Sequence, residues 1–594
     1  MLKLFTAILA LLHYTPVAVA LHEGLFQPFD AQEPFVQHES DGRGGSAFYQ
    51  FSHEIRRVAV IGAGPAGLQA AAVLLQDGFD VRLFERSERP GGNWNYDEEV
   101  AVPASYPANM SNLVNLSYVP DVPPTLPYTH VYEDGEDGFT TSYRLREQHR
   151  PSAAYHNMSS ISPPFIMTLP GINHQPDIPW KPNNKYLQRY VRQFASAHGI
   201  NSNDVEYPGV LSYSTRVEKI HKPKGAQRWT ITLRKLERIP HENKVRAHWW
   251  TEEADAIVVA TGDFDAAWIP SIEGISEAQH AFPERLIHSR EYRRPDKYTG
   301  KNVLVVGASI SALGIATDLL PFAQSVSISV RYHPKNETNP LREVFLARLP
   351  SNISIVPEIS KITLPKHHLY SDVAELELTW RNGTIGSGYD YIIFATGFRR
   401  SNPFLADYHN STIKGHDEPE TRIAPLITDG THVRSLHWTG HYIDDPTLGI
   451  MRLVAWTLNR YQAVAFSRTW AGKARLPSRE KMWATYPGPG KELRFFHGRE
   501  QWYTRYLIAW LNNEAVEFGG EFVEYIPREY EALDTYGRAE FFPTTSAKVQ
   551  REMEQMPRSE WNARTGPEDS PAYGAAFSHS AQPDHTQHAV KKQI

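Results

Sequence analysis

Residues 58–75 read VAVIGAGPAGLQAAAVLL, and this stretch decides the fold. It opens with consecutive aliphatic residues, which is typical of a strand buried on both faces of a parallel sheet, and it continues into an apolar helix. Between the two, Gly62 makes a tight turn, Gly64 lets the backbone approach a pyrophosphate, and Gly67 lets the helix pack closely on the strand. The stretch therefore predicts a dinucleotide-binding unit.

The end of the second strand of this unit selects the nucleotide. Glu85 closes a second apolar run, 18 residues after Gly67. A carboxylate at this position accepts hydrogen bonds from ribose hydroxyls and repels a 2′-phosphate, so the unit favours FAD or NAD over NADP. The helix begins near Pro65 and Ala66, and its positive end is where we expect the pyrophosphate.

Residues 302–320, NVLVVGASISALGIATDLL, repeat the strand-turn-helix pattern. Gly307 is kept, whereas Ser309 and Ala312 replace the other two glycines. These small residues still permit a close approach, and the hydroxyls of Ser309 and Ser311 can donate hydrogen bonds to phosphate.

The second unit also ends its second strand differently. Arg331 follows that strand, at the place where Glu85 closes the first unit. A guanidinium there suits a 2′-phosphate, because it can form charge-assisted, bidentate hydrogen bonds. We therefore expect NADPH at the second site.

The composition excludes several classes of protein. A chain of 594 residues with 41% hydrophobic and 22% charged residues predicts a globular protein of more than one lobe. The net charge of −6 gives no reason to expect a nucleic-acid partner. The absence of cysteine excludes dithiol chemistry and thiolate-bound metals. Histidines such as His437 and His441 lack the spacing of metal ligands, so no metal site is predicted.

The N-terminus indicates entry into the secretory pathway, as an ER-luminal or secreted protein. Residues 1–20 contain Lys3, an apolar stretch and a small-residue cleavage site at Ala18-Val19-Ala20, as in a signal peptide; an uncleaved anchor at the ER membrane is the alternative. No second segment of 18 apolar residues follows, so the mature chain should not span a membrane. Seven sequons favour a glycoprotein, and they start at Asn109, Asn115, Asn157, Asn336, Asn352, Asn382 and Asn410.

We expect an α/β fold with two Rossmann-like dinucleotide-binding domains, the NADP-binding domain being inserted into the FAD-binding domain. The predicted parts are a signal peptide (1–20), a linker (21–54), a first FAD-binding part (55–265) with a surface insertion (95–150), the NADP-binding domain (266–392), a second FAD-binding part with C-terminal helices (393–550), and a disordered tail (551–594).

Gly92, Asn93 and Trp94, which come shortly after Glu85, resemble the second FAD signature of the flavin-containing monooxygenases, the N- and S-oxygenating branch of the class B flavoprotein monooxygenases. The resemblance extends from about Arg56 to Met482. Further matches are Tyr155, Met158, Ser160, Pro163 and Met167 in the segment beside the flavin, Ala260-Thr261-Gly262 and Ala395-Thr396-Gly397 at the two linkers, Phe282, His288 and Ser289 in the family fingerprint, and Gln462-Ala463, Gly472, Leu476-Pro477-Ser478 and Met482 in the C-terminal helix. Thr261, Thr396 and Gly397 are accordingly expected to bind the cofactors.

The resemblance implies a monooxygenase in which NADPH reduces FAD and the reduced flavin reacts with O2. One oxygen atom then passes to a soft nitrogen or sulfur nucleophile on a small molecule or peptide. With an N-terminal signal, this activity would suit a tailoring step in natural-product biosynthesis. Beyond the substrate and O2, no partner is predicted.

Departures from the family pattern leave alternatives open. Ile161 occupies a position that is usually asparagine in N- and S-oxygenating relatives, so no catalytic side chain is assigned, and a flavin oxidase releasing hydrogen peroxide is a second hypothesis. Tyr292 and Arg293 stand where the Baeyer–Villiger branch has tryptophan followed by proline or aspartate, which counts against ketone-to-ester chemistry. A flavoprotein retained as a binding module is a further hypothesis.

Overall fold

The computed structural model describes residues 47–100, 103–108, 122–162, 164–179, 181–202, 209–331, 346, 348–365, 371–413, 424–451, 453, 455–488 and 499–524. The predicted signal peptide, most of the linker and the predicted tail lie outside these residues, as do Pro163 and the sequons at Asn109, Asn115 and Asn336.

The chain divides into two units, and the smaller one contains the described residues 47–50 and 477–485. In this small unit Phe48 forms a bridge with Pro477, and helix α11 (Arg479–Ala484) is capped by the side chain of Ser478. All elements below belong to the larger unit.

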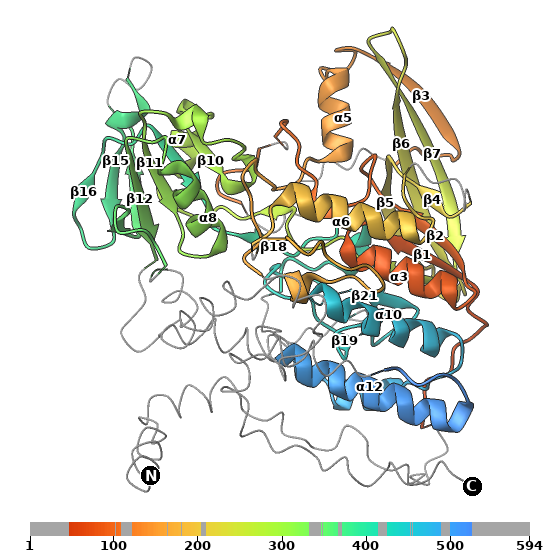
Figure 1. Cartoon of the computed structure of the whole chain (residues 1–594). Coiled ribbons are helices and arrows are strands. Elements are labelled where there is room, and N and C mark those ends of the chain that lie inside the picture. The colour runs from red at the N-terminus through yellow and green to blue at the C-terminus, as the bar shows by residue number, and fades with distance from the viewer. Residues whose placement is uncertain are drawn as a thin grey trace, which may run out of the picture. The chain divides into compact units, whose positions relative to one another are not determined.

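The first sheet of the larger unit has seven strands in the order β19-β20-β21-β8-β1-β2-β4 (Figure 1). Its strands are β1 (Arg57–Ile61), β2 (Asp80–Phe84), β4 (Leu211–Ser212), β8 (Ala256–Val259), β19 (Leu436–His437), β20 (His441–Tyr442) and β21 (Leu448–Ile450). β21, β8, β1, β2 and β4 run parallel, and the other two strands join antiparallel at one edge.

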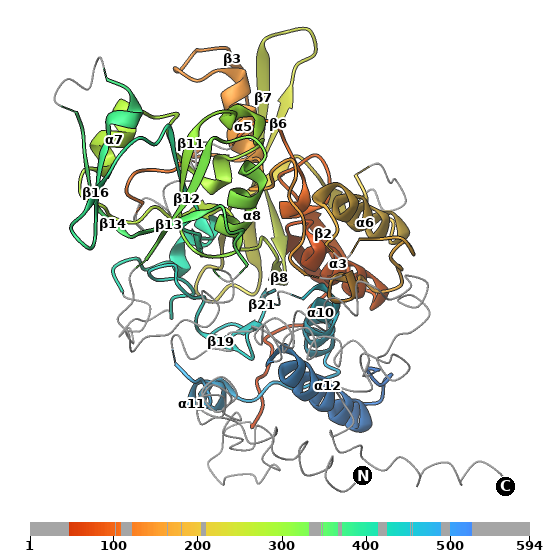
Figure 2. The same ribbon diagram turned by 60° about the vertical axis from the view of Figure 1, so that its left-hand side comes forward.

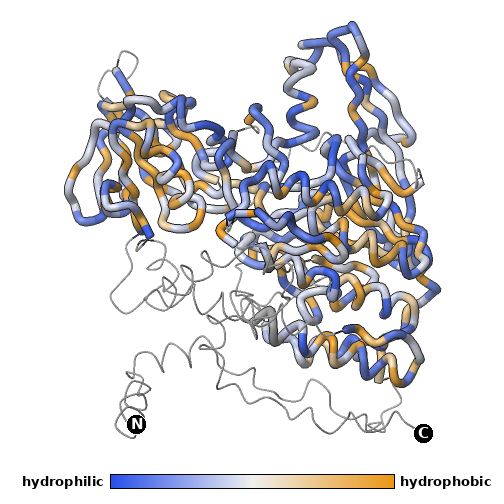
Figure 3. Tube along the Cα trace, in the orientation of Figure 1, coloured by the Kyte–Doolittle hydropathy of each residue, from blue (hydrophilic) through white to orange (hydrophobic). Residues whose placement is uncertain are grey.

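Side chains of β1 point into two cores, which confirms that this strand is buried on both faces. Val58 and Val60 pack in one core with helices α3 (Pro65–Gln76), α6 (Asn184–Ala197), α10 (Trp456–Trp470) and α12 (Arg499–Phe518). Ala59 and Ile61 pack in the other. In Figure 3, α3 and the central strands are largely hydrophobic, as this double burial requires.

The second sheet consists of five parallel strands in the order β10-β17-β11-β12-β13. They are β10 (Leu286–His288), β11 (Asn302–Val306), β12 (Ser325–Val330), β13 (Ser354–Pro357) and β17 (Tyr391–Phe394). All five lie in the sequence between β8 and β20 of the first sheet, which confirms that the second dinucleotide unit is inserted into the first. β17 runs two residues beyond 392, where the prediction ended this domain.

Smaller elements surround this sheet. Helix α8 (Ile310–Leu319) connects β11 with β12, and helix α7 (Ile275–Ala281) precedes β10. A three-stranded antiparallel sheet contains β14 (Ile359–Thr363), β15 (Glu377–Trp380) and β16 (Ile385–Gly386). The short 3-10 helices are η1 (Gly92–Trp94), η2 (Pro164–Met167), η3 (Ser289–Glu291), η4 (Asp296–Tyr298), η6 (Val373–Glu375) and η7 (Pro403–Tyr408).

The two connections between the dinucleotide units lie side by side. β9 (Ala266–Ala267) leads into the inserted unit and β18 (Phe398–Arg399) leads out of it, and the two strands pair antiparallel. Trp268 N donates to Gly397 O next to this ribbon at 2.9 Å.

The predicted surface insertion at 95–150 is more structured than its sequence suggested. It contributes β3 (Tyr128–Glu133) and helix α5 (Thr141–His149), and Figure 2 shows α5 close to β3, β6 and β7. β3 completes a four-stranded antiparallel sheet with β5 (Thr215–His221), β6 (Trp229–Arg238) and β7 (Lys244–Ala254), in the order β3-β7-β6-β5 (Figure 1). The sequence shows little periodicity here because α5 buries charge rather than apolar side chains, and Figure 3 shows it mostly hydrophilic. Glu147 on this helix lies 2.5 Å from Arg216 and 3.0 Å from Arg234, with all three residues buried.

Candidate cofactor-binding site

The glycine turn after β1 is packed so tightly that two of its positions accept only glycine. Gly62 has a φ of +101°, and a Cβ there would lie 2.8 Å from the carbonyl oxygen of Ala260. A Cβ on Gly67 would lie 1.9 Å from the carbonyl oxygen of Gly62. Both distances are shorter than real Cβ contacts, so helix α3 approaches the turn as closely as a Rossmann phosphate site requires.

Glycine suits position 64 for a different reason. It is the N-cap of α3, its backbone is extended, and no side chain caps the helix. A Cβ on Gly64 would meet only the Cα of Gly92, at 3.8 Å, an ordinary contact. The protein's own packing therefore does not demand glycine here. The open N–H groups and the space beside Gly64 fit a pyrophosphate that approaches the backbone.

Glu85 follows β2 and lies beside this turn. It is 7% exposed, and its carboxylate accepts hydrogen bonds from Ala63 N at 2.7 Å and Ser87 N at 2.8 Å. Because a carboxylate has about four acceptor positions, it keeps room for ribose hydroxyls. These contacts hold the Glu85 carboxylate at the end of β2, beside the glycine turn.

Gly92, Asn93 and Trp94 form a turn, called the GNW turn below, that places the second FAD signature beside the glycine turn after β1. Gly91 N donates to Ala63 O at 3.0 Å, and Gly92 has a φ of +56°. The Trp94 ring packs edge-on against Trp456, the first residue of α10, with ring centres 5.6 Å apart. The turn thus joins the N-terminal end of α3 to that of α10.

Two buried polar atoms without a partner lie where α3 meets α10. Gln69 is 1% exposed and donates from Nε2 to Trp456 O at 3.0 Å, while its Oε1 has no hydrogen-bond partner among the described residues. The hydroxyl of Thr457, in the first turn of α10, is also buried and has no hydrogen-bond partner among the described residues. Buried polar atoms rarely stay unpaired, and no side chain caps this helix at Ala455. The arrangement fits the polar edge of a flavin ring.

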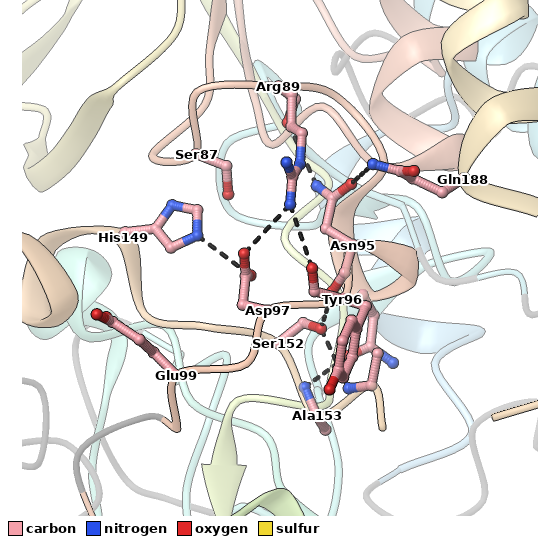
Figure 4. A network of polar contacts seen from close by, with 12 residues as sticks. Ser87, Arg89, Asn95, Tyr96, Asp97, Glu99, His149, Ser152, Ala153 and Gln188 are labelled. Atoms are coloured by element: carbon pink, nitrogen blue, oxygen red, sulfur yellow. Dashed lines mark hydrogen bonds and ion pairs between the residues drawn. The ribbon is translucent and has the colours of Figure 1, made fainter. Parts of the chain in front are cut away.

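A network of polar contacts holds the loop after the GNW turn in place (Figure 4). Asp97 pairs with Arg89 at 3.2 Å and with His149, the last residue of α5, at 3.3 Å. Burial alone would raise the pKa of Asp97, but His149 and Arg89 outweigh it and lower the pKa. Gln188 on α6 donates to Asn95 Oδ1 at 3.1 Å.

Asn93 is predicted to bind the cofactor, and its side-chain oxygen accepts a hydrogen bond from the segment that precedes Tyr155. Ala153 N donates to Asn93 Oδ1 at 3.3 Å, and Ser152 Oγ donates to Asn95 O at 2.5 Å. The loop that contains the GNW turn is therefore tied to the residues just before Tyr155.

The second glycine turn repeats part of this geometry. Gly307 has a φ of +131°, and a Cβ there would lie 2.4 Å from the carbonyl oxygen of Ala395. Ser309 is the exposed N-cap of α8 and makes no side-chain cap bond, and Ser311 lies half-buried in the first turn. These are the positions at which the sequence predicts phosphate contacts.

Positive charge gathers near the end of β12. Arg331 directly follows this strand and is exposed. Burial lowers the pKa of Arg399, and the positive charges of Arg331 and Arg400 lower it further, against the opposing effect of Asp429. This local surplus of guanidinium groups suits an anionic group such as a 2′-phosphate.

Thr261, Thr396 and Gly397 lie at the two connections between the dinucleotide units, where the first two make side-chain hydrogen bonds. Thr261 Oγ1 donates to Asn402 Oδ1 at 3.2 Å, and Thr396 Oγ1 donates to Trp268 O at 2.5 Å. Gly397 has a φ of +84°, and a Cβ there would meet nothing within 4 Å, so its conformation and not its size calls for glycine. The cofactor contacts expected of these residues stay predictions.

His288 is a packing residue. It is fully buried, and its Nε2 lies 3.0 Å from Gly397 O while Arg290 N donates to its Nδ1 at 3.1 Å. Burial lowers the pKa of His288 to about 3, and the charge of Arg290 adds to the shift. A neutral ring with both nitrogens in use cannot serve as a proton carrier.

The segment expected beside the flavin is held by its own hydroxyls. Ser160 is buried and donates to Ser162 O at 2.8 Å, with the sulfur of Met167 2.9 Å away. Ile161 lies half-buried between these two serines. The structure thus presents an apolar side chain where an amide is usual in N- and S-oxygenating relatives.

Sequence reasoning missed Gln69 and Thr457. Gln69 had a signal, since it is the one polar residue inside an otherwise apolar helical run from Leu68 to Leu75. Thr457 had none, because its importance depends on the contact between α10 and the distant helix α3. Among the described residues, no group of three or more metal-ligating side chains is arranged for a metal ion, and no helix has the length and hydropathy to cross a membrane.

Family comparisons match both dinucleotide units. Residues 231–426 match the family described as pyridine nucleotide-disulphide oxidoreductase, and residues 60–118 match the NAD(P)-binding Rossmann-like domain. Because the sequence contains no cysteine, the first match reflects the shared fold and not disulfide chemistry.

Curated proteins match the chain over most of its length. Flavin-containing monooxygenase iboF of Amanita muscaria is 38% identical over 545 residues, which are 86% of this chain and 98% of that protein. Flavin-containing monooxygenase ustF2 of Aspergillus flavus is 29% identical over 517 residues, 80% of this chain and 96% of that protein. Senecionine N-oxygenase of Tyria jacobaeae is 24% identical over 433 residues, 72% of this chain and 74% of that protein.

Solved structures share the fold. Tmm from Pelagibacter sp. gives a TM-score of 0.52 at 18% identity and covers 84% of this chain and 90% of that one. S-allyl-L-cysteine S-oxygenase from Allium sativum gives a TM-score of 0.51 at 18% identity and covers 86% of this chain and 96% of that one.

Proposed function

Because this chain belongs to the flavin-containing monooxygenases, we propose that it transfers one oxygen atom to a soft nitrogen or sulfur nucleophile of a small molecule or peptide, as a tailoring step in making a natural product. It is a monooxygenase that uses FAD and NADPH. The observation that carries the proposal is the contrast within one chain between Glu85 at the end of β2 and Arg331 at the end of β12. The first suits a ribose, the second a 2′-phosphate.

Each cofactor has its own set of residues. Glu85, Gly64 and the open end of α3 would hold the adenosine and pyrophosphate of FAD, and Gln69 and Thr457 would pair with polar atoms of its ring. Ser309, at the start of α8, and Arg331 would hold NADPH. When bound, this pair of cofactors supplies hydride transfer and the activation of O2.

The protein's own contribution is orientation and exclusion of water. Trp94 and Trp456 pack edge-on against each other at the N-terminal end of α10. The Ile161 side chain offers no hydrogen bond to a substrate or to an oxygen species, so this side chain can contribute to orientation only through shape and apolar contact.

Nitrogen compounds are the first substrates to test. The support is senecionine N-oxygenase, whose name states nitrogen oxygenation, although it is only 24% identical to this chain. The test is a panel of tertiary amines, hydroxylamines and thioethers incubated with enzyme, FAD, NADPH and O2, with mass spectrometry of the products. A gain of one oxygen atom that requires NADPH supports the proposal. Consumption of NADPH with hydrogen peroxide as the only product across the panel opposes it.

A second candidate function is a flavin oxidase, and Ile161 favours it. An oxidase would take electrons from its substrate and would release hydrogen peroxide without added NADPH. Rapid mixing of NADPH-reduced enzyme with oxygen separates the two functions. Flavin reoxidation in two resolved phases, the slower one accelerated by substrate, supports the monooxygenase, whereas a single fast phase supports the oxidase.

Baeyer–Villiger chemistry has less support. Tyr292 is fully buried and donates to Asp318 Oδ2 at 2.7 Å, and Arg293 donates to backbone carbonyls of the described residues, among them Arg290 O at 2.8 Å. Both side chains are thus committed to internal contacts. Conversion of a ketone to an ester would establish this chemistry in spite of them.

We also propose that the enzyme works in the secretory pathway, either in the ER lumen or secreted. The supports are the signal-like residues 1–20 and the positions of three sequons. Asn352 and Asn382 are exposed at turns, and Asn410 is half-buried next to the exposed Thr412. A shift in mobility on enzymatic deglycosylation would agree with this location, and an unmodified protein from a secreting host would oppose it.

A further inference from the structure

Asn157 differs from the other described sequons in how its amide is used. Its Nδ2 donates to Asp318 Oδ1 at 2.9 Å. In Asn382 and Asn410 the side-chain oxygen is engaged instead, and it accepts from the threonine two residues later. N-glycosylation attaches a sugar to the amide nitrogen. At Asn157 that nitrogen already has a protein partner.

Asp318 connects this amide to the inserted dinucleotide unit. It lies on α8, the helix whose N-terminal end is expected to hold NADPH phosphates. One carboxylate oxygen accepts from Asn157, and the other accepts from the hydroxyl of the fully buried Tyr292 at 2.7 Å. A single side chain of α8 therefore joins two segments that are far apart in the sequence.

The neighbouring residues repeat the same connection. The Tyr155 hydroxyl lies so close to α8 that a Cβ on Gly314 would be 2.6 Å from it. The ring of Tyr155 packs edge-on against Tyr292, with centres 5.3 Å apart, and His156 N donates to Arg293 O at 2.8 Å. Residues 155–157 thus contact both α8 and the fingerprint segment around Tyr292 and Arg293. Asn157 adds its contact with α8 through Asp318.

Arg293 secures the same segment from its other side. Its guanidinium donates to Ser152 O at 3.1 Å, to Ala154 O at 3.4 Å and to Glu99 O at 2.9 Å. Glu99 lies in the loop after the FAD signature. The segment is consequently fixed between the FAD signature loop and the helix of the NADPH site.

We propose that Asn157 is a positioning residue, whose unmodified amide sets the distance between the segment beside the flavin and helix α8, and thereby the rate at which NADPH reduces FAD. Asn157 is exposed, so its hydrogen bond contributes little to global stability. Its effect is on local geometry, to which hydride transfer is sensitive because the two reacting atoms must be held in contact. The proposal rests on the cofactor pair and is independent of the substrate proposed above.

Three variants separate this role from glycosylation. Ser159→Ala destroys the sequon and leaves the Asn157 amide in place; Ser159 is exposed. Asn157→Asp destroys the sequon and also replaces the donor with a carboxylate facing Asp318. The double variant N157D/D318N exchanges the two groups, so that the new amide at position 318 can donate to position 157 and still accept from Tyr292.

The measurements are the limiting rate of anaerobic flavin reduction and the Kd of NADPH, both from stopped-flow absorbance, with dithionite reduction and Tm as controls. We expect Asn157→Asp to slow reduction by NADPH about tenfold, the effect of losing one hydrogen bond to a charged group and gaining a like-charge contact. Ser159→Ala should stay within twofold of the parent, and the double variant should recover most of the loss. Dithionite reduction and Tm should not change.

Three results would overturn the proposal. The first is a normal reduction rate in Asn157→Asp. The second is an equal loss in Ser159→Ala, which would assign the effect to a glycan. The third is a double variant no faster than the single one, which would exclude the pairwise contact. Peptide mass spectrometry of the secreted protein adds an independent test, because a glycan on Asn157 in the active enzyme also contradicts the proposal.

Discussion

Replacing Gly64 and Gly67 with alanine, one at a time, tests the assignment of the FAD site. The two glycines lie three residues apart, but a methyl group meets different surroundings at each. On Gly67 the Cβ would lie 1.9 Å from Gly62 O and 3.2 Å from the Cβ of Ala260. On Gly64 it would lie 3.8 Å from Gly92 Cα. The first change therefore strains the protein itself, and the second does not.

The magnitudes follow from these distances. To bring 1.9 Å up to a tolerable 3.0 Å or more, the N-terminal turn of α3 must move by at least an ångström from the Gly62 loop. Overpacking of this kind costs about 3 kcal/mol, so the Tm of the apoprotein should fall by several degrees. Gly64 has a φ of −75°, which alanine also adopts, so Gly64→Ala should leave the apoprotein Tm unchanged.

The affinity for FAD should fall in Gly64→Ala, the variant whose apoprotein Tm is expected to stay unchanged. In Gly64→Ala the new methyl group occupies the space that a pyrophosphate needs, and a displacement of this kind costs about 1–3 kcal/mol, or roughly 5- to 150-fold in Kd. The assay is titration of apoprotein with FAD, followed by flavin fluorescence, beside thermal unfolding without FAD. A Gly64→Ala protein that binds FAD normally, or one whose apoprotein is as unstable as Gly67→Ala, would refute this assignment.

Three further predictions concern single residues. Arg331→Ala should lower the ratio of kcat/KM for NADPH to that for NADH by about 10- to 100-fold, since it removes the charge opposite the 2′-phosphate; an unchanged ratio in steady-state assays would place the phosphate elsewhere. His288 has a folded pKa of about 3 against 6.5 in the unfolded chain, so its contribution to stability is complete above about pH 6.5 and is lost as the pH falls toward 3. In urea unfolding, His288→Gln should reduce the slope of stability against pH in that window by about 1.4 kcal/mol per pH unit, and an unaltered slope would contradict the buried neutral ring. Glu147→Gln should destabilise the protein by about 3–5 kcal/mol, because it leaves Arg216 and Arg234 buried without their shared carboxylate; a change in Tm of less than a degree would argue against it.

The two dinucleotide units were predictable because their information is local. The strand before Gly62 is a continuous aliphatic run, the helix begins at Pro65 as expected, and β12 ends directly before Arg331. In each unit the turn chemistry, the hydrophobic pattern and the charge at the end of the second strand lie within about thirty residues. A single sequence contains all of these signals.

The insertion at 95–150 was not predictable in the same way. Helix α5 has no broad apolar face, and its buried Glu147 pairs with guanidinium groups 69 and 87 residues later in the chain. Periodicity analysis detects apolar faces and has no means of finding such a pairing. The same applies to Arg293, whose carbonyl acceptors at Glu99 and Ser152 are some 140 to 190 residues away.

The paired strands β9 and β18 have a consequence for the modularity of the enzyme. Ala267 is opposite Phe398, so about 130 residues of chain leave and return at one point. An insertion with adjoining ends can be exchanged as a cassette, because the host chain needs only a short turn to close the gap. A related enzyme's nicotinamide module grafted between these two positions offers a way to change the electron donor, provided that the graft keeps Tyr292, Arg293 and Asp318, which contact the oxygenating half of the molecule.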